Sequence, residues 1–320
     1  MGSYIGKQVK NVAYLVLCIG ISIIMLYPTT TNASAIAFLY DVEGNTWTSL
    51  NYPGAHDIEA HSINDAGQVV GNYLSEGIGL RGFLYDGITW TSLNYPGASG
   101  TALLGINDAG QVVGYYVDYA VNNHGFLYDG ITWTSLEYPG ALSTSLSGIN
   151  DAGQVVGHYG KSGNTGGFFL YDGITWTALE HPGGYNIQAF DINDAGQIVG
   201  YYYDGTGWCG FLYDVDGNTW TSLEYPGAFS TLPHGINDAG QIVGYYKSQG
   251  IGSRGFLYDG ITWTSLEYPD ASFNVYPRAF DINDAGQIVG NLANIPEPAT
   301  MLLLGFGLIM LTGIRKRFSA

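Results

Sequence analysis

Cysteine is almost absent from this sequence, with two residues in 320. Cys18 lies in an apolar stretch near the start, and Cys209 stands alone in the body of the chain. Because the stretch around Cys18 is expected to be removed, no disulfide can form within the remaining chain. A disulfide-stapled fold is therefore excluded, and packing must stabilise the protein. We expect no role for Cys209, with an intermolecular disulfide as the alternative.

Basic residues are also scarce. Residues 36–295 contain five of them against 26 acidic residues, a net charge of −21. Nucleic acids and anionic lipid surfaces are bound by clustered Lys and Arg. This composition therefore excludes nucleic acid as a partner. It is compatible with a soluble extracellular protein, or with one that recruits divalent cations.

Motifs for catalysis and cofactor binding are missing. The chain has no Gly-x-Ser-x-Gly elbow, phosphate-binding loop or dinucleotide fingerprint, and its six histidines form no His-x-x-x-His pair. Residues Asp214–Asn218 resemble the start of a Ca²⁺ loop but lack the downstream Glu, so a hairpin turn is favoured. We predict no catalytic residue, no metal ligand and no cofactor, with Ca²⁺ at this turn as the alternative.

One segment recurs six times. Ile63–Gly71 reads Ile-Asn-Asp-Ala-Gly-Gln-Val-Val-Gly. Near-identical copies begin 43, 43, 43, 44 and 46 residues apart, at Ile106, Ile149, Ile192, Ile236 and Ile282. An active site occurs once in a protein, whereas Asp65 has six equivalent copies, so we expect it to have a structural role in a turn. In that turn Asn64 is expected to hydrogen-bond the backbone, and Gly67 is expected to adopt the left-handed conformation. A period of this size is typical of propellers, solenoids and arrays.

Each repeat also carries a Phe-Leu-Tyr segment and a Thr-Trp-Thr-Ser-Leu segment, both rich in strand-forming residues. Turn signals such as Asp-Gly-Ile join the two. The Phe-Leu-Tyr segments start at Phe38, Phe83, Phe126, Phe168, Phe211 and Phe256, and the tryptophans are Trp47, Trp90, Trp133, Trp176, Trp220 and Trp263. With the two strands that flank the Asn-Asp-Ala-Gly turn, each repeat supplies four strands, and the body shows no helical period.

Six repeats of four strands predict an all-β fold, a six-bladed β-propeller over residues 36–295. The phase of the repeats places residues 37–50 and 279–292 in one shared blade. Pairing of the N- and C-terminal strands would then close the ring. A β-solenoid is the alternative, although the hairpin turns argue against it. The repeats loosely resemble kelch repeats.

The Ile-Asn-Asp-Ala-Gly-Gln-Val-Val-Gly element, with a small residue and Phe downstream, resembles the HAF family of extracellular repeats. All six copies match this element, and the family's His-Ala-Phe has its nearest counterpart in His124-Gly125-Phe126. The resemblance implies a surface or secreted location and implies no reaction.

Both ends of the chain are apolar and expected to be helical. Residues 1–35 are predicted to be a secretory signal peptide, with Lys7 and Lys10 before an apolar run and a signal peptidase site marked by Ala33 and Ala35. An uncleaved membrane anchor is the alternative.

The C-terminal residues 296–320 have three ordered parts. Pro296, Glu297 and Pro298 precede a predicted transmembrane segment at 299–314, and Arg315, Lys316 and Arg317 follow it. Such basic residues stay on the cytoplasmic side of a membrane. This tail resembles the PEP-CTERM sorting signal. The resemblance implies transient anchoring in the inner membrane of a Gram-negative bacterium, recognition by an exosortase-type protease, and delivery to the surface or the medium. An ordinary C-terminal anchor is the alternative.

The loops before the Phe-Leu-Tyr segments differ between repeats. They carry Tyr119, Tyr203 and Trp208, the one tryptophan of the body outside the repeat pattern. Aromatic side chains on variable loops over a rigid scaffold suit ligand binding, so we predict a ligand-binding role for these three. Residues 229–234 and 273–278 are expected on the opposite face, as a second candidate surface.

The sequence therefore predicts a non-enzymatic, exported propeller that binds or scaffolds material of the extracellular or biofilm matrix. By resemblance to proteins with this tail, that material is expected to be exopolysaccharide or surface protein. A propeller hydrolase or lyase acting on polysaccharide is one alternative. A structural coat protein without a specific ligand is the other.

Overall fold

A computed structural model describes residues 36–55, 57–75, 77, 79–162, 165–249, 251–269 and 275–294. The chain divides into two compact units, residues 1–32 and 33–320, and every described residue belongs to the second. The predicted signal peptide with its cleavage site and the tail 296–320 lie outside the described residues. In the part that is described, no helix has the length and apolar character needed to cross a membrane.

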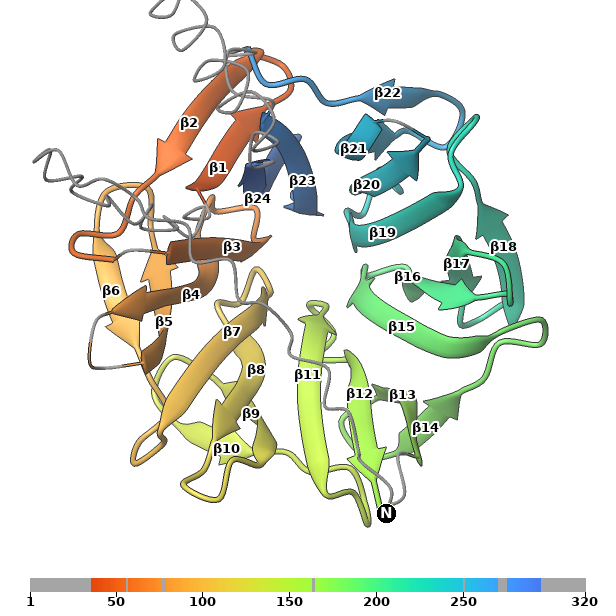
Figure 1. Cartoon of the computed structure of the whole chain (residues 1–320). Helices are drawn as coiled ribbons and strands as arrows, with labels where there is room; N and C mark the ends of the chain where they lie inside the picture. Colours follow the sequence, from red (N-terminus) through yellow and green to blue (C-terminus); the bar gives the residue numbers. More distant parts are fainter. Residues whose placement is uncertain are drawn as a thin grey trace, which may run out of the picture. The chain divides into compact units, whose positions relative to one another are not determined.

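The described residues form six antiparallel sheets of four strands each, arranged around a common centre (Figure 1). The predicted all-β six-bladed propeller is therefore confirmed. In every blade the innermost strand is the one that ends at the Ile of the repeat, and the outermost strand is the one that contains the Trp.

The first three blades follow one another along the chain. Blade 1 contains β3 (Asp57–Ile63), β4 (Val69–Ser75), β5 (Gly79–Tyr85) and β6 (Trp90–Leu93). Blade 2 contains β7 (Gly100–Ile106), β8 (Val112–Val117), β9 (Asn123–Tyr128) and β10 (Trp133–Ser135). Blade 3 contains β11 (Ser143–Ile149), β12 (Val155–Lys161), β13 (Thr165–Tyr171) and β14 (Trp176–Leu179).

The last three blades complete the ring. Blade 4 contains β15 (Tyr185–Ile192), β16 (Gln197–Tyr203), β17 (Trp208–Asp214) and β18 (Thr219–Leu223). Blade 5 contains β19 (Ser230–Ile236), β20 (Ile242–Ser248), β21 (Ile251–Tyr258) and β22 (Trp263–Ser265). Blade 6 combines β23 (Val275–Ile282) and β24 (Gln287–Asn294) with β1 (Ile36–Asp41) and β2 (Thr46–Leu50).

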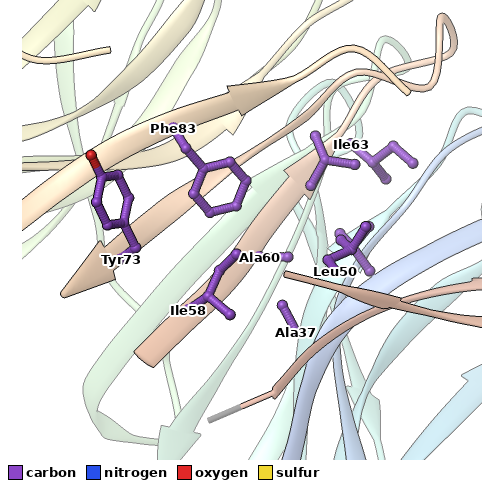
Figure 2. Close-up of a cluster of buried hydrophobic side chains, with 9 residues drawn as sticks. Ala37, Leu50, Ile58, Ala60, Ile63, Tyr73 and Phe83 are labelled. Atoms are coloured by element: carbon purple, nitrogen blue, oxygen red, sulfur yellow. The ribbon is translucent and has the colours of Figure 1, made fainter. Parts of the chain in front are cut away.

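Blade 6 is the shared blade that the repeat phase predicted. Strand β1 pairs antiparallel with β24, with Phe38 opposite Gly290. Figure 2 shows the adjoining core, where Ala37 and Leu50 of blade 6 lie against Ile58 and Ala60 of blade 1. The two ends of the body are therefore held together by a sheet ladder and by apolar packing.

The Asn-Asp-Ala-Gly turn joins the two inner strands of each blade as predicted. In blade 1 the backbone N–H of Gln68 donates to Asn64 Oδ1 at 2.9 Å, and Gly67 has a φ of +75°. Further along the strand, a Cβ on Gly71 would collide with the carbonyl oxygen of Glu59. This confirms that the last Gly of the repeat marks a close approach of two backbones.

The same turns also join neighbouring blades, which the sequence did not predict. Each turn Asn donates through Nδ2 to the backbone oxygen of the Asn in the next blade, at 3.0 to 3.1 Å. Each turn Asp donates its backbone N–H to the next Asp carboxylate, at 2.7 to 2.9 Å. Both circuits close, from Asn283 to Asn64 and from Asp284 to Asp65. The repeat is therefore the joint between blades as well as a turn.

One phenylalanine per blade is completely buried, and in blade 3 it is Phe169 rather than the predicted Phe168. The pairing decides this, since Phe169 lies opposite Gly157 as Phe83 lies opposite Gly71. Phe168 occupies the position that is glycine in blades 1, 2, 4 and 5. The sequence placement was therefore wrong by one residue, because two adjacent phenylalanines cannot be told apart by pattern.

The Tyr-Pro-Gly linkers pack into the blade that follows them. Tyr52 stacks on Tyr73 with ring centroids 4.0 Å apart and meets Trp90 edge-on at 5.5 Å. Strands alternate in direction, so the linkers share a face with the loops that join the second and third strands. The backbone N–H of Phe229 accordingly donates to the carbonyl of Lys247 at 2.9 Å. The expected opposite placement of 229–234 was therefore wrong, and residues 273–274 lie outside the described range.

The joint between blades gives a stability prediction. Asn107 is buried and makes three side-chain hydrogen bonds, two with Gln111 and one with the backbone oxygen of Asn150. Asn107→Ala should lower the free energy of unfolding by about 2–3 kcal/mol, because each lost hydrogen bond contributes about 1 kcal/mol. Denaturant unfolding measures this. The exposed linker variant Asn51→Ala should change it by less than about 0.5 kcal/mol, and equal effects would contradict the proposed joint.

Candidate binding site

Every innermost strand has a β-bulge two residues before the Ile of the repeat. In β3 the pairing with β4 shifts between Ala60 and Ser62, which makes His61 the extra residue. The other inner strands shift at the equivalent place and add Leu104, Ser147, Phe190, His234 and Phe280. A bulge redirects a side chain, and all six extra residues line one cavity of about 350 Å³. We name it the channel cavity because inner strands of all six blades border it.

Four of the bulge residues form an arc of rings. Phe190 and His234 stack with centroids 4.4 Å apart, and Phe280 lies 5.3 Å from His234. His61 continues the arc 5.9 Å from Phe280. The arc thus spans blades 4, 5, 6 and 1. Blades 2 and 3 contribute the smaller Leu104 and Ser147, so the free space lies on their side.

His234 is a neutral imidazole with a defined tautomer. Its Nδ1 lies 2.9 Å from the backbone oxygen of Leu232, so Nδ1 carries the hydrogen and Nε2 keeps its lone pair. Burial lowers the pKa of His234 to about 4, and the nearby His61 and Arg278 act in the same direction. The ring therefore presents a hydrogen-bond acceptor at neutral pH.

Two aspartates follow bulge residues. Asp281 accepts hydrogen bonds from Ser62 Oγ at 2.6 Å and from the N–H groups of Ile63 and Ile282 at 2.9 and 2.8 Å. Asp191 accepts from the N–H of Ile236 at 3.0 Å. Each carboxyl group therefore reaches from its own blade to the next one, and Asp281 joins blade 6 to blade 1.

The two carboxyl groups also interact with each other. Burial raises the pKa of both: that of Asp281 to about 6, and that of Asp191 well above its usual range, where the charge of Asp281 adds to the effect. Asp191 is partly accessible to solvent although protein surrounds it, because it faces the channel cavity. The donors around Asp281 favour its ionised form, so Asp191 holds the proton that the pair shares.

This pair has little capacity left for chemistry. A carboxylate offers about four lone-pair positions. Ser62, Ile63 and Ile282 occupy three of those on Asp281. The hydrogen bonds of this pair therefore serve to hold neighbouring blades together.

A second cavity, of about 680 Å³, lies between blades 3 and 4. We name it the seam cavity. It is bordered by Phe168 of β13, by Glu180 and His181 of the linker, by Gln188 of β15 and by Trp208 of β17. His158, Phe168 and Gln188 border both cavities, so their side chains form the partition between the two.

The three predicted ligand-binding residues occupy different places. Trp208 borders the seam cavity, edge-on to Tyr203 with ring centroids 5.4 Å apart, and the two lie opposite each other in β16 and β17. Tyr119 lies on the loop between β8 and β9 of blade 2 and is 85 % exposed. The structure therefore brings Trp208 and Tyr203 together and places Tyr119 in another blade.

The linker at the seam cavity departs from the repeat. His181 replaces the linker tyrosine, stacks on Tyr202 at 3.8 Å and meets Trp220 edge-on at 4.7 Å. Burial lowers the pKa of His181. Gly184 stands where other linkers have alanine, and a Cβ there would collide with the ring of Tyr202. This linker thus keeps the stacking of the repeat and adds a polar ring.

Two other predicted features have simple local structures. Asp214 Oδ1 accepts the N–H of Gly217 at 2.8 Å, and residues 215–218 form the hairpin turn between β17 and β18. Cys209 Sγ lies 3.5 Å from Asp204 Oδ2; burial first, and then that carboxylate, raise the thiol pKa to about 11. Among the described residues, no group of three or more His, Cys, Asp and Glu side chains could hold a metal ion.

Residues 294–317 match the PEP-CTERM protein-sorting motif, in agreement with the tail read from Pro296-Glu297-Pro298. The match implies export, and processing by exosortase, a membrane protease. No curated protein matches the chain. Membership of the HAF repeat family stays a prediction.

The fold is similar to that of solved propellers. A putative TolB from Agrobacterium tumefaciens superposes with a TM-score of 0.62 at 13 % identity, covering 82 % of this chain and 99 % of that one. TolB from Acinetobacter baumannii gives 0.54 at 14 %, covering 81 % of this chain and 63 % of that one. A six-bladed fungal lectin from Aleuria aurantia gives 0.46 at 15 %, covering 73 % and 92 %. At identities this low, the two TolB structures show a shared fold alone.

The proton held by Asp191 predicts a pH dependence. The folded state keeps this proton after the unfolded chain has lost it at a pKa near 4, so the contribution of Asp191 to stability should fall as pH rises above about 4. Asp191→Asn mimics the protonated side chain, so its unfolding free energy should fall less over the same range.

The matched control is Asp86→Asn. Asp86 accepts the N–H groups of Thr89 and Ile88, which lower its pKa, so its contribution is lost only in acid. Chemical denaturation from pH 3 to 8 tests both variants. Parallel profiles for wild type and Asp191→Asn would rule out a proton shared by the pair.

Proposed function

We propose that this protein is an exported, surface-sorted binding module that attaches to polysaccharide of the extracellular or biofilm matrix through the seam cavity. The observation that carries the proposal is the coincidence, at one seam, of three departures from the repeat: Phe168, His181 and Trp208. Phe168 stands where other blades have glycine, and His181 stands where the other linkers have tyrosine. Trp208 adds a ring at a position where the other repeats have no tryptophan.

The seam cavity has the composition of a saccharide site. Trp208 offers an apolar face for the C–H groups of a sugar ring. Glu180, His181 and Gln188 offer hydrogen-bonding groups to hydroxyls around the same cavity. Its volume of about 680 Å³ is large enough for more than one sugar unit.

The terminal segments support a surface role. Export would begin with signal peptidase cleavage near Ala33 and Ala35. The tail would then hold the protein briefly in the inner membrane until an exosortase-type protease acts near Pro296-Glu297-Pro298. The propeller would finally reach the cell surface or the medium, where matrix polysaccharide is the abundant partner.

A polysaccharide-active hydrolase or lyase is the second candidate. Asp191 and Asp281 favour it, since two carboxyl groups with separated pKa values are what acid–base catalysis needs. The three hydrogen bonds that Asp281 already accepts from Ser62 and the backbone argue against it. Turnover of matrix polysaccharide that is lost in Asp191→Asn would support the enzyme.

The binding role predicts the effect of Trp208→Ala. Loss of the aromatic face should weaken binding to polysaccharide from the producing cells by about tenfold to a hundredfold, since one stacked ring contributes on the order of 1–3 kcal/mol. Co-sedimentation of the full chain with isolated matrix measures this. Tyr119→Ala is the matched aromatic control in another blade. Absence of wild-type binding would favour the coat protein.

The sorting role predicts the effect of replacing Pro296, Glu297 and Pro298 with alanine. The variant should keep its C-terminal segment and remain with the inner membrane, because the protease no longer recognises it. Mass spectrometry and cell fractionation would show both effects. An unchanged mass and location would contradict the role of the tail.

A further inference from the structure

We propose that the channel cavity is a second binding site, which takes a single uncharged sugar ring and is separated from the seam cavity by a shared partition of side chains. The proposal rests on the shape of the cavity, on the polar groups that face it and on the partners that most charged groups around it already have.

The repeat itself creates the space. The bulges place six side chains at one level of the channel, and four of these side chains are rings that form an arc. Ser147 and Leu104 are smaller than the rings of the arc, so two adjacent blades leave part of the channel unfilled. At about 350 Å³ the cavity lies within the usual size of small-molecule sites, ~300–1,000 Å³.

Four polar groups face this space without a protein partner among the described residues. They are His234 Nε2, the ring of His158, the amide of Gln188 and the hydroxyl of Ser147. None of these four side chains is fully buried, so each can bond water or a ligand that enters the cavity. Together they offer acceptors and donors from blades 3, 4 and 5, as the hydroxyls around a sugar ring require.

The arc supplies the apolar contact. Phe190 and Phe280 flank His234, so a ring that donates a hydroxyl to Nε2 lies against aromatic faces. Aromatic faces suit the C–H side of a saccharide. A purely apolar ligand would leave the four polar groups unpaired.

Charged ligands fit less well, because most charged groups near the channel already have a partner within the protein. The exception among the described residues is Nε of Arg278, which is buried without a hydrogen-bond partner. Asp281 already accepts three hydrogen bonds from Ser62, Ile63 and Ile282. The Arg278 guanidinium lies 5.1 Å from the ring centroid of Tyr245 and donates to Ser253 at 3.3 Å. Glu59 pairs with His61 at 3.6 Å. The ligand class that remains is uncharged and rich in hydroxyls.

The test is direct binding of methyl hexosides and methyl 6-deoxyhexosides to the full chain in mild detergent, by calorimetry or saturation-transfer NMR. Glucuronic acid and glucosamine serve as charged comparators. At least one neutral glycoside should bind, and both charged sugars should bind more weakly.

Two substitutions of His234 distinguish loss of the Nε2 acceptor from a general effect on folding. His234→Asn keeps a donor near Nδ1 but removes Nε2, and should weaken binding about tenfold or more. His234→Gln places an amide near Nε2 and should weaken it about threefold or less. His124→Asn makes the same change outside the cavity and should leave binding unchanged. Ser147→Leu fills the cavity and should abolish binding, which decides the matter if His234→Asn does not fold.

Each other outcome overturns the proposal. If no neutral glycoside binds, solvent alone occupies the channel. If His234→Asn and Ser147→Leu both leave binding unchanged, the sugar does not bind in the channel. Tighter binding of a charged sugar overturns the ligand class. Binding lost in Trp208→Ala but kept in both channel variants assigns the sugar to the seam cavity, and leaves the proposed function standing without this second site.

Discussion

The closed circuit of Asn-Asp-Ala-Gly turns is the constraint on which the rest of the structure depends. A propeller must hold six similar blades in a ring although each blade is only a small sheet. Here the same turn that reverses the chain also donates to the next turn, and the circuit returns to its start. The strand pairing of β1 with β24 completes this closure. The ring therefore needs no disulfide, which agrees with the near absence of cysteine.

A rigid ring leaves other positions free to vary. The Ile, Asn, Asp and Gly of the repeat carry the backbone contacts, so the residue two places before the Ile needs only to fit a bulge. Histidine, leucine, serine and phenylalanine all occur there. The variation is therefore concentrated at one level of the channel, where the six side chains meet. A scaffold of this kind can change its channel lining without changing its joints.

The asymmetry between blades matters as much as their similarity. Blades 3 and 4 differ most from the repeat, with Phe168 in place of glycine and His181 in place of tyrosine. Both cavities border this seam and share its partition. The aspartates Asp191 and Asp281 show another asymmetry, since other blades have serine or glycine there. They strengthen two particular joints, one between blades 4 and 5 and the other between blades 6 and 1.

The sequence by itself determined the number of blades, their strand order, the turns and the shared blade, because a repeat period and hairpin signals are local properties. It also indicated Trp208, since one tryptophan broke the pattern. Only the tertiary structure decided that the turns bond across blades, that Phe169 is the buried ring, and that His61, His234 and the two aspartates converge. Those residues lie up to about 220 positions apart in the chain. Bulges aim them inward, and neither a bulge nor a contact between blades leaves a signal within a single repeat.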